Sequence, residues 1–214
     1  MAPDRNRSRA AATSGRLRAR IRNRSRDAAT KDRLRARIAG GSVVVAAGGA
    51  LIGSSFLGWI TTPMTGGGRA SISGWGTISG GNPLVDGANF NALMAGVGSY
   101  RPGAPALLIG AVTVIPGLIL AVTGAGRRPS RVLGAVLAVC GLAALVWGLW
   151  KAVAPGDALG VLPGGQGSPG AGPMLAAAAG VAILVVAGLL FAGRLDPLDP
   201  AGPVRRAGVQ PGRR

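Results

Sequence analysis

Four long apolar runs limit the fold of this chain more than any other feature. Each spans about twenty residues with no charge in its interior, and they lie at about 41–61, 104–124, 132–151 and 173–193. A helix rises about 1.5 Å per residue, so each run can cross a hydrocarbon core about 30 Å thick. No alternating barrel pattern is present, and unpaired backbone is costly in lipid. The sequence therefore predicts an all-α integral membrane protein with a four-helix transmembrane bundle over 41–194.

The alternative for the first run is a cleaved signal peptide. The basic leader before this run is about forty residues long, which far exceeds the basic region of an ordinary signal peptide. The apolar run is also longer than the apolar region of such a peptide. We therefore expect the first run to be a transmembrane span.

Residue types that carry enzyme chemistry are scarce. The chain has no His and no Glu, and Cys140 is its one cysteine. A metal site lacks most of its usual ligands, and a Ser–His–Asp or Cys–His nucleophile lacks its base. We therefore expect no enzyme activity, no catalytic residue, no metal and no cofactor. Cys140 lies in the middle of the third run, and we interpret it as a small buried apolar residue.

The basic residues are divided unevenly along the chain. Twenty-one of the 24 lie in the N-terminal tail 1–40, in the turn 125–131 and after the fourth run. Cytoplasmic connections of membrane proteins are enriched in Lys and Arg, and short connections are the most informative. The pattern predicts a plasma (inner) membrane protein with both tails, 1–40 and 195–214, in the cytoplasm. The opposite side would carry only Arg69, Arg101 and Lys151.

The two connections 62–103 and 152–172 then form outer loops. The first is rich in Gly and contains Trp75 between Ile72 and Ile78, so we interpret Trp75 as a contact residue of this loop. We expect a short helix at about 88–99. The second loop is rich in Pro and Gly and is predicted to be flexible. Three other tryptophans lie at the outer ends of spans, where indoles favour the membrane interface. These predicted interface anchors are Trp59, Trp147 and Trp150.

The N-terminal tail repeats the hexapeptide RLRARI at 16–21 and 33–38. On a helical wheel its apolar residues fall within an arc of about 140°, which predicts a basic amphipathic helix lying on anionic lipid headgroups. A disordered, solvated tail is the alternative interpretation, because Gly15 and Asn23 weaken a helix. Nucleic acid is not the partner we expect, since no aromatic side chain for base stacking precedes Phe56. The candidate lipid-surface residues are Arg16, Arg18, Arg20, Arg33, Arg35 and Arg37.

Small residues recur at helical spacing within the runs and predict close helix packing. They form a GxxxG pair in the first run, a seven-residue repeat in the third and a small-xxx-small pair in the fourth. These small residues have two alternative roles. They can pack helices within the bundle, or they can contact another membrane protein or a second copy of the chain. The packing candidates are Gly49, Gly53, Gly134, Gly141, Gly148, Ala176 and Gly180.

The polar groups of the runs are hydroxyls, which can bond to carbonyls of their own helix. They are Ser54, Ser55, Thr113 and Thr123. A polar pore lining would need more groups than these, and coupled transport generally needs ionisable side chains at depth.

The layout and residue usage resemble those of small four-pass membrane proteins of high-GC bacteria. The chain has twenty-two Arg but only Lys31 and Lys151, and it is rich in Ala, Gly and Val. The resemblance covers 41–195. The layout is superficially similar to that of claudins, but their paired loop cysteines are absent. The leading hypothesis is a non-enzymatic accessory or scaffold protein of the cell envelope, and the alternative is a small oligomeric channel or exporter.

Overall fold

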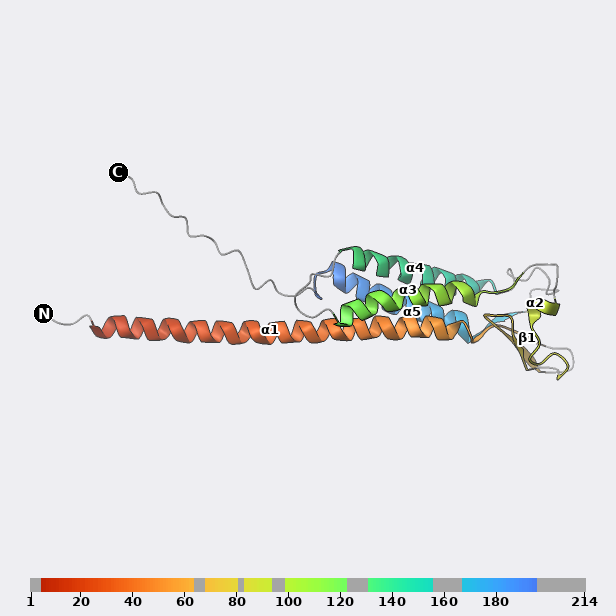
Figure 1. The fold of residues 1–214 in the computed structure, drawn as a ribbon, viewed down its shortest axis with the longest axis horizontal. Helices are drawn as coiled ribbons and strands as arrows, with labels where there is room; N and C mark the ends of the chain where they lie inside the picture. The colour runs from red at the N-terminus through yellow and green to blue at the C-terminus, as the bar shows by residue number, and fades with distance from the viewer. Residues whose placement is uncertain are drawn as a thin grey trace, which may run out of the picture.

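The computed structural model describes residues 5–63, 68–80, 83–93, 99–122, 131–155 and 167–195, with side chains from residue 27 onward in the first helix. Four long helices form a bundle, and a small sheet lies at one end of it (Figure 1). We call this the sheet end. At the opposite, tail end the first helix extends beyond the other three, and the last helix ends (Figure 1).

The four long helices are α1 (Arg5–Ser54), α3 (Gly103–Val122), α4 (Arg131–Val153) and α5 (Ala171–Phe191). In α1 the segment Asp27–Ser54 is long and apolar enough to cross a membrane. The other three helices are each long and apolar enough to do so as well. The chain thus has the helices of a multi-pass membrane protein, as the apolar runs predicted.

The outward faces of α3 and α4 are apolar. Both helices expose rows of large aliphatic side chains, among them Leu108, Val112, Ile115, Val139, Leu142 and Val146. Soluble monomers rarely expose a continuous apolar surface of this kind, whereas lipid favours it. The surface therefore agrees with a membrane environment.

The basic tail continues α1 without a break from Arg5. The structure therefore contains the helical form of the tail and not the disordered one. Near the bundle, however, the predicted apolar stripe is incomplete, because Ile38 is exposed while Arg37 is buried. Arg37 thus belongs to the packed part of α1, unlike the exposed Arg35.

Glycines bring the helices into contact in two pairs, α1 with α3 and α4 with α5. In the first pair, a Cβ on Gly48 would lie 3.0 Å from the Gly110 carbonyl oxygen. In the second, a Cβ on Gly180 would lie 2.8 Å from the Gly141 carbonyl oxygen. The helix α5 also packs on α1 and so joins the two pairs.

The buried hydroxyls bond within their own helices. Ser54 Oγ donates to Leu51 O (2.7 Å), and Thr113 Oγ1 donates to Ile109 O (2.7 Å). Ser55, the residue directly after α1, donates in the same way to Ile52 O of that helix, and Thr123 lies outside the described residues. These hydroxyls therefore satisfy backbone carbonyls and do not line a polar channel.

The expectation of an all-α fold is wrong at the sheet end. The first helix ends at Ser54 and not near residue 61. Antiparallel strands follow in the order β3-β2-β1-β4, namely β1 (Gly58–Pro63), β2 (Arg69–Ser73), β3 (Ile78–Ser79) and β4 (Ser168–Pro169). The sequence GWITTP is apolar enough to extend a predicted span, but its aromatic and β-branched residues favour a strand.

The two outer loops meet in this sheet. Strand β4, from the second loop, pairs with β1 through Ile60–Pro169 and Thr61–Ser168. The second loop is therefore ordered in part, contrary to the prediction that it is flexible. The expected helix at 88–99 is present as α2 (Phe90–Leu93), and 94–98 lie outside the described residues.

Candidate functional site

The sheet end has an apolar core separate from that of the bundle. Ile60, Ile72 and Ile78 from three strands pack with Tyr100, which precedes α3, and Phe90 packs against them. The rings of Phe90 and Tyr100 meet edge to face at 6.1 Å. The strands, α2 and the segment before α3 therefore form one small folded unit, which we call the cap.

Trp59 fixes the cap to the bundle. Its indole is 1% exposed and packs with the helix core, and Nε1 donates to Ser54 O at the end of α1 (2.8 Å). A Cβ on Gly172 would lie 2.6 Å from Trp59 Nε1, so α5 begins directly against this ring. Sequence reasoning assigned Trp59 to the lipid interface, whereas the structure places it inside the protein.

Asn91 holds the segment that leads into α3. Its Nδ2 donates to Trp75 O (3.3 Å) and Tyr100 O (3.2 Å), and its Oδ1 accepts from Tyr100 N. Gly103 N donates to Gly74 O (2.9 Å). These bonds position residues 99–102. Burial raises the pKa of the Tyr100 phenol above its usual value.

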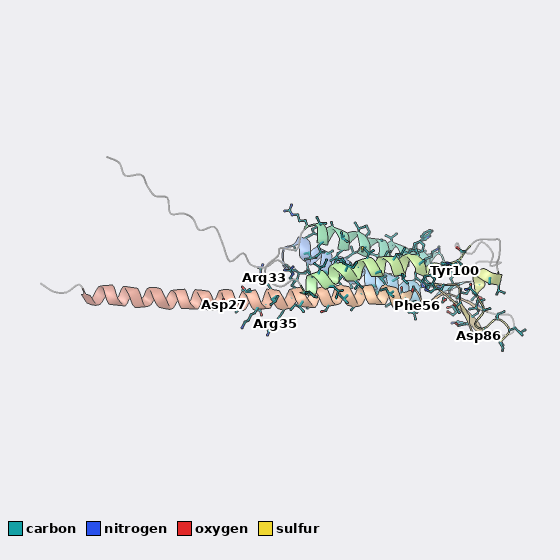
Figure 2. All side chains as sticks on the ribbon, in the orientation of Figure 1. Asp27, Arg33, Arg35, Phe56, Asp86 and Tyr100 are labelled. Carbon is teal, nitrogen blue, oxygen red and sulfur yellow. The ribbon has the colours of Figure 1, made fainter. Side chains whose placement is uncertain are left out.

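Trp75 lies between β2 and β3, beside the end of α1. Its ring stands 6.3 Å from that of Phe56, at an angle of 39°. Trp75 Nε1 is buried and has no hydrogen-bond acceptor among the described residues. The structure thus places Trp75 beside Phe56, two residues after the end of α1, and Phe56 is exposed (Figure 2).

The end of α4 carries an aromatic and cationic cluster. The rings of Trp147 and Trp150 meet edge to face at 5.5 Å, and Lys151 Nζ lies 5.1 Å and 4.6 Å from their centroids. A cation over an indole face is favourable, more so where water is excluded, and Lys151 is 8% exposed. Trp150 is 52% exposed, as an interface residue would be. Trp147 instead faces the protein, because its Nε1 donates to Pro102 O (3.1 Å).

A pocket lies between this cluster and the segment before α3. It has a volume of about 300 Å³ and opens to the surface. Its lining includes Tyr100 and Arg101 on one side, Trp147 and Lys151 on the other, and Pro105 in the first turn of α3. It therefore combines two cations, two aromatic rings and the positive end of a helix dipole.

Sequence reasoning did not select this pocket. Its two sides lie about fifty residues apart in the chain, so no local motif joins them. One signal was present, because two of the three basic residues outside the inner segments directly follow an aromatic residue, in Tyr100–Arg101 and Trp150–Lys151.

The packing candidates divide into two groups. Gly134, Gly141, Gly148 and Gly180 lie between α4 and α5, and Ala176 is fully buried. A Cβ on Gly49 or Gly53 would meet nothing within 4 Å, so this GxxxG pair faces outward. A role for the pair in contact with a second protein stays a prediction.

The remaining candidate residues lie on the tail. The side chains of Arg16, Arg18 and Arg20 lie outside the described part of α1. Arg33 and Arg35 lie on α1 at the tail end, beyond most of the bundle (Figure 2). The distance between the tail and the cap keeps the lipid-surface candidates apart from the pocket.

The described part of the chain contains no candidate metal site. No group of three His, Cys, Asp or Glu side chains is close enough there to hold a metal ion. Cys140 is buried within α4.

No protein-family model matches the chain, and no curated protein sequence matches it.

Proposed function

We propose that the chain is a non-enzymatic accessory or scaffold protein of the plasma membrane that presents its cap to other envelope components. The observation that carries this proposal is the attachment of the cap through Trp59, which contacts the end of α1 and the start of α5. A loop needed only to connect two spans would not require a buried tryptophan and a sheet built from both outer loops. A cap fixed in this way can offer a preformed surface to a partner.

The charge distribution supports an outward-facing cap. The tail, the 125–131 turn and the C-terminal segment carry twenty-one basic residues, against three at the sheet end. By the positive-inside tendency, the tail end is cytoplasmic. Asp86, Phe56 and Tyr100 then lie on the outer side of the membrane, and Arg33 and Arg35 lie on the inner side (Figure 2).

The contact surface that we propose includes two exposed leucines of the cap. Leu84, in the turn after β3, is 89% exposed, and Leu93, in α2, is 59% exposed. Neither belongs to a membrane-spanning helix. Exposed apolar side chains on a folded cap are suited to the buried centre of a protein contact.

Site-specific photo-crosslinking in the native cells tests this function. A benzophenone side chain at Leu84 or Leu93 is expected to form discrete adducts with another envelope protein or with a second copy of the chain. The matched control is the same side chain at Val122, which is exposed at the tail end of α3. Absence of protein adducts from both cap positions, or equal adducts from Val122, would contradict the proposal.

A further inference from the structure

The pocket between Arg101 and Lys151 gathers positive charge where the chain has little of it. Only three basic residues lie at the sheet end, and two of them line this one pocket. The third, Arg69, lies on β2. The first turn of α3 adds the positive end of a helix dipole. The potential inside the pocket therefore favours an anion.

The two cations differ in how firmly they are held. Lys151 is 8% exposed and lies over two indole rings, so its ammonium is placed at the pocket wall. Arg101 is exposed, and its guanidinium can close over a ligand with two parallel hydrogen bonds. A fixed point charge combined with a planar fork suits a phosphate group, which offers several acceptor oxygens.

Among the described residues, no acidic side chain lines the pocket. Asp86 Oδ1 accepts from Gly80 N (2.8 Å), which fixes that carboxylate in the turn after β3. The other acid of the sheet-end segments, Asp157, lies outside the described residues.

The position of the pocket indicates where the phosphate comes from. Trp150, at the rim of the cluster, is half exposed, and Val153, one turn later, is exposed. Tryptophan and lysine at a helix end are typical of the headgroup layer of a bilayer. A volume of about 300 Å³ is at the lower end of ligand pockets and admits a headgroup but not a large substrate.

We infer that this pocket binds a phosphate group, presented by a lipid headgroup at the membrane surface. The identification of a lipid as the source of the phosphate rests on the proposed membrane placement. The phosphate site itself does not. The pocket prefers a headgroup without an ammonium, such as phosphatidylglycerol, because Arg101 and Lys151 repel the cation of phosphatidylcholine. The bound lipid would hold the end of α4 to the segment before α3, since these two elements form the two sides of the pocket.

Native mass spectrometry of the full chain in a neutral detergent tests the inference. Dihexanoyl phosphatidylglycerol, dihexanoyl phosphatidylcholine and inorganic phosphate are each added to separate samples. The phosphatidylglycerol adduct is expected to exceed the phosphatidylcholine adduct. R101Q and K151Q are each expected to weaken it about tenfold, the loss for one charge-assisted hydrogen bond.

Three matched variants separate binding from folding and from net charge. R69Q removes an exposed cation of the cap outside the pocket and is expected to bind as the wild type does. K151R keeps the charge at the nearly buried position and is expected to retain most of the binding. D157N keeps both cations and is expected to bind at least as well as the wild type. Because Arg101 is exposed, R101Q also tests the pocket without disturbing packing.

The outcomes distinguish the possible sources. Binding of phosphatidylglycerol that depends on Arg101 and Lys151 supports the lipid. Binding of inorganic phosphate with the same dependence, and without a lipid adduct, supports the phosphate site but assigns it a soluble ligand. Absence of both adducts, or equal losses in R69Q and R101Q, would overturn the inference. Binding of lipid or phosphate in detergent requires no envelope partner. Failure of this binding test is therefore separate from failure of the photo-crosslinking test.

Discussion

The two ends of the helix bundle use positive charge in different ways. At the tail end the basic residues are many, and most of them are carried on a single helix that projects beyond its neighbours (Figure 1). At the sheet end they are few, and two of three line one pocket with aromatic rings. Many exposed basic residues are attracted together to the anionic lipid of a membrane surface. A nearly buried charge is screened less by salt and interacts mainly with the groups in contact with it. The comparison separates charge that orients a protein from charge that can bind a ligand.

The two ends also differ in how tightly α4 and α5 meet. A Cβ on Gly148, near the sheet end, would lie 2.6 Å from Ala177 N and 2.7 Å from Pro173 O. At the tail end, a Cβ on Gly134 would meet the Phe191 ring at 3.4 Å. The contact is with backbone at one end and with a side chain that can move at the other. The two helices therefore approach each other more closely at the sheet end.

The largest expected effect comes from removing the ring that joins cap and bundle. We expect W59A to destabilise the cap by about 3–5 kcal/mol, because the ring is fully buried and its truncation leaves a cavity. Trypsin cleavage after Arg69, in β2, measures the opening of the cap and should become faster by roughly a hundredfold or more. W150A is the control, because this indole is half exposed. Equal cleavage of both variants would show that Trp59 does not hold the cap.

A smaller effect distinguishes the two ends of the α4–α5 contact. We expect G148A to destabilise the bundle by about 1–3 kcal/mol, since the added methyl meets backbone that cannot move aside. G134A should be neutral or slightly stabilising, because Phe191 can shift and Ala favours a helix over Gly. Thermal unfolding in mild detergent measures both variants. A larger loss of stability in G134A than in G148A would contradict the closer approach of the helices at the sheet end.

The smallest effect concerns the single tyrosine of the chain. Burial raises the pKa of Tyr100, so the folded protein keeps the phenol protonated at a pH where the unfolded chain ionises it. This contribution to stability is complete below about pH 10, the usual tyrosine pKa, and is lost as the pH rises above it. At about pH 11, absorbance near 295 nm should show no tyrosinate until the protein is unfolded. Tyrosinate in the folded protein at that pH would show that the cap core is open to solvent.

The sequence was sufficient to predict the helices, because each uncharged run is long enough to span a bilayer and α3, α4 and α5 fall close to the expected limits. It was not sufficient to predict the sheet. The alternation in β1 covers only a few residues directly after an apolar run, and β4 pairs with it from more than a hundred residues away, as in the bond from Ser168 Oγ to Thr61 O. The short local pattern was therefore absorbed into the predicted span.

The site was less predictable than the fold, for a related reason. Trp59 looks like an interface anchor from its place at the end of an apolar run, and only the start of α5 against its ring shows that it is buried. Gly49 and Gly53 match a packing motif, but helix rotation directs them outward and places Gly48 at the contact with α3. Spacing along a helix shows which residues share a face, but not which face meets the neighbour.

The central claim is that the cap faces outward and the basic tail inward, and labelling with a membrane-impermeant maleimide tests it most directly. L84C and S25C are made singly in a C140S background, so that each protein has one thiol. In intact spheroplasts we expect L84C to be labelled at once and S25C to be labelled only after lysis. Labelling of S25C before lysis, with L84C protected, would contradict the orientation and with it the account of how the two ends use their charge.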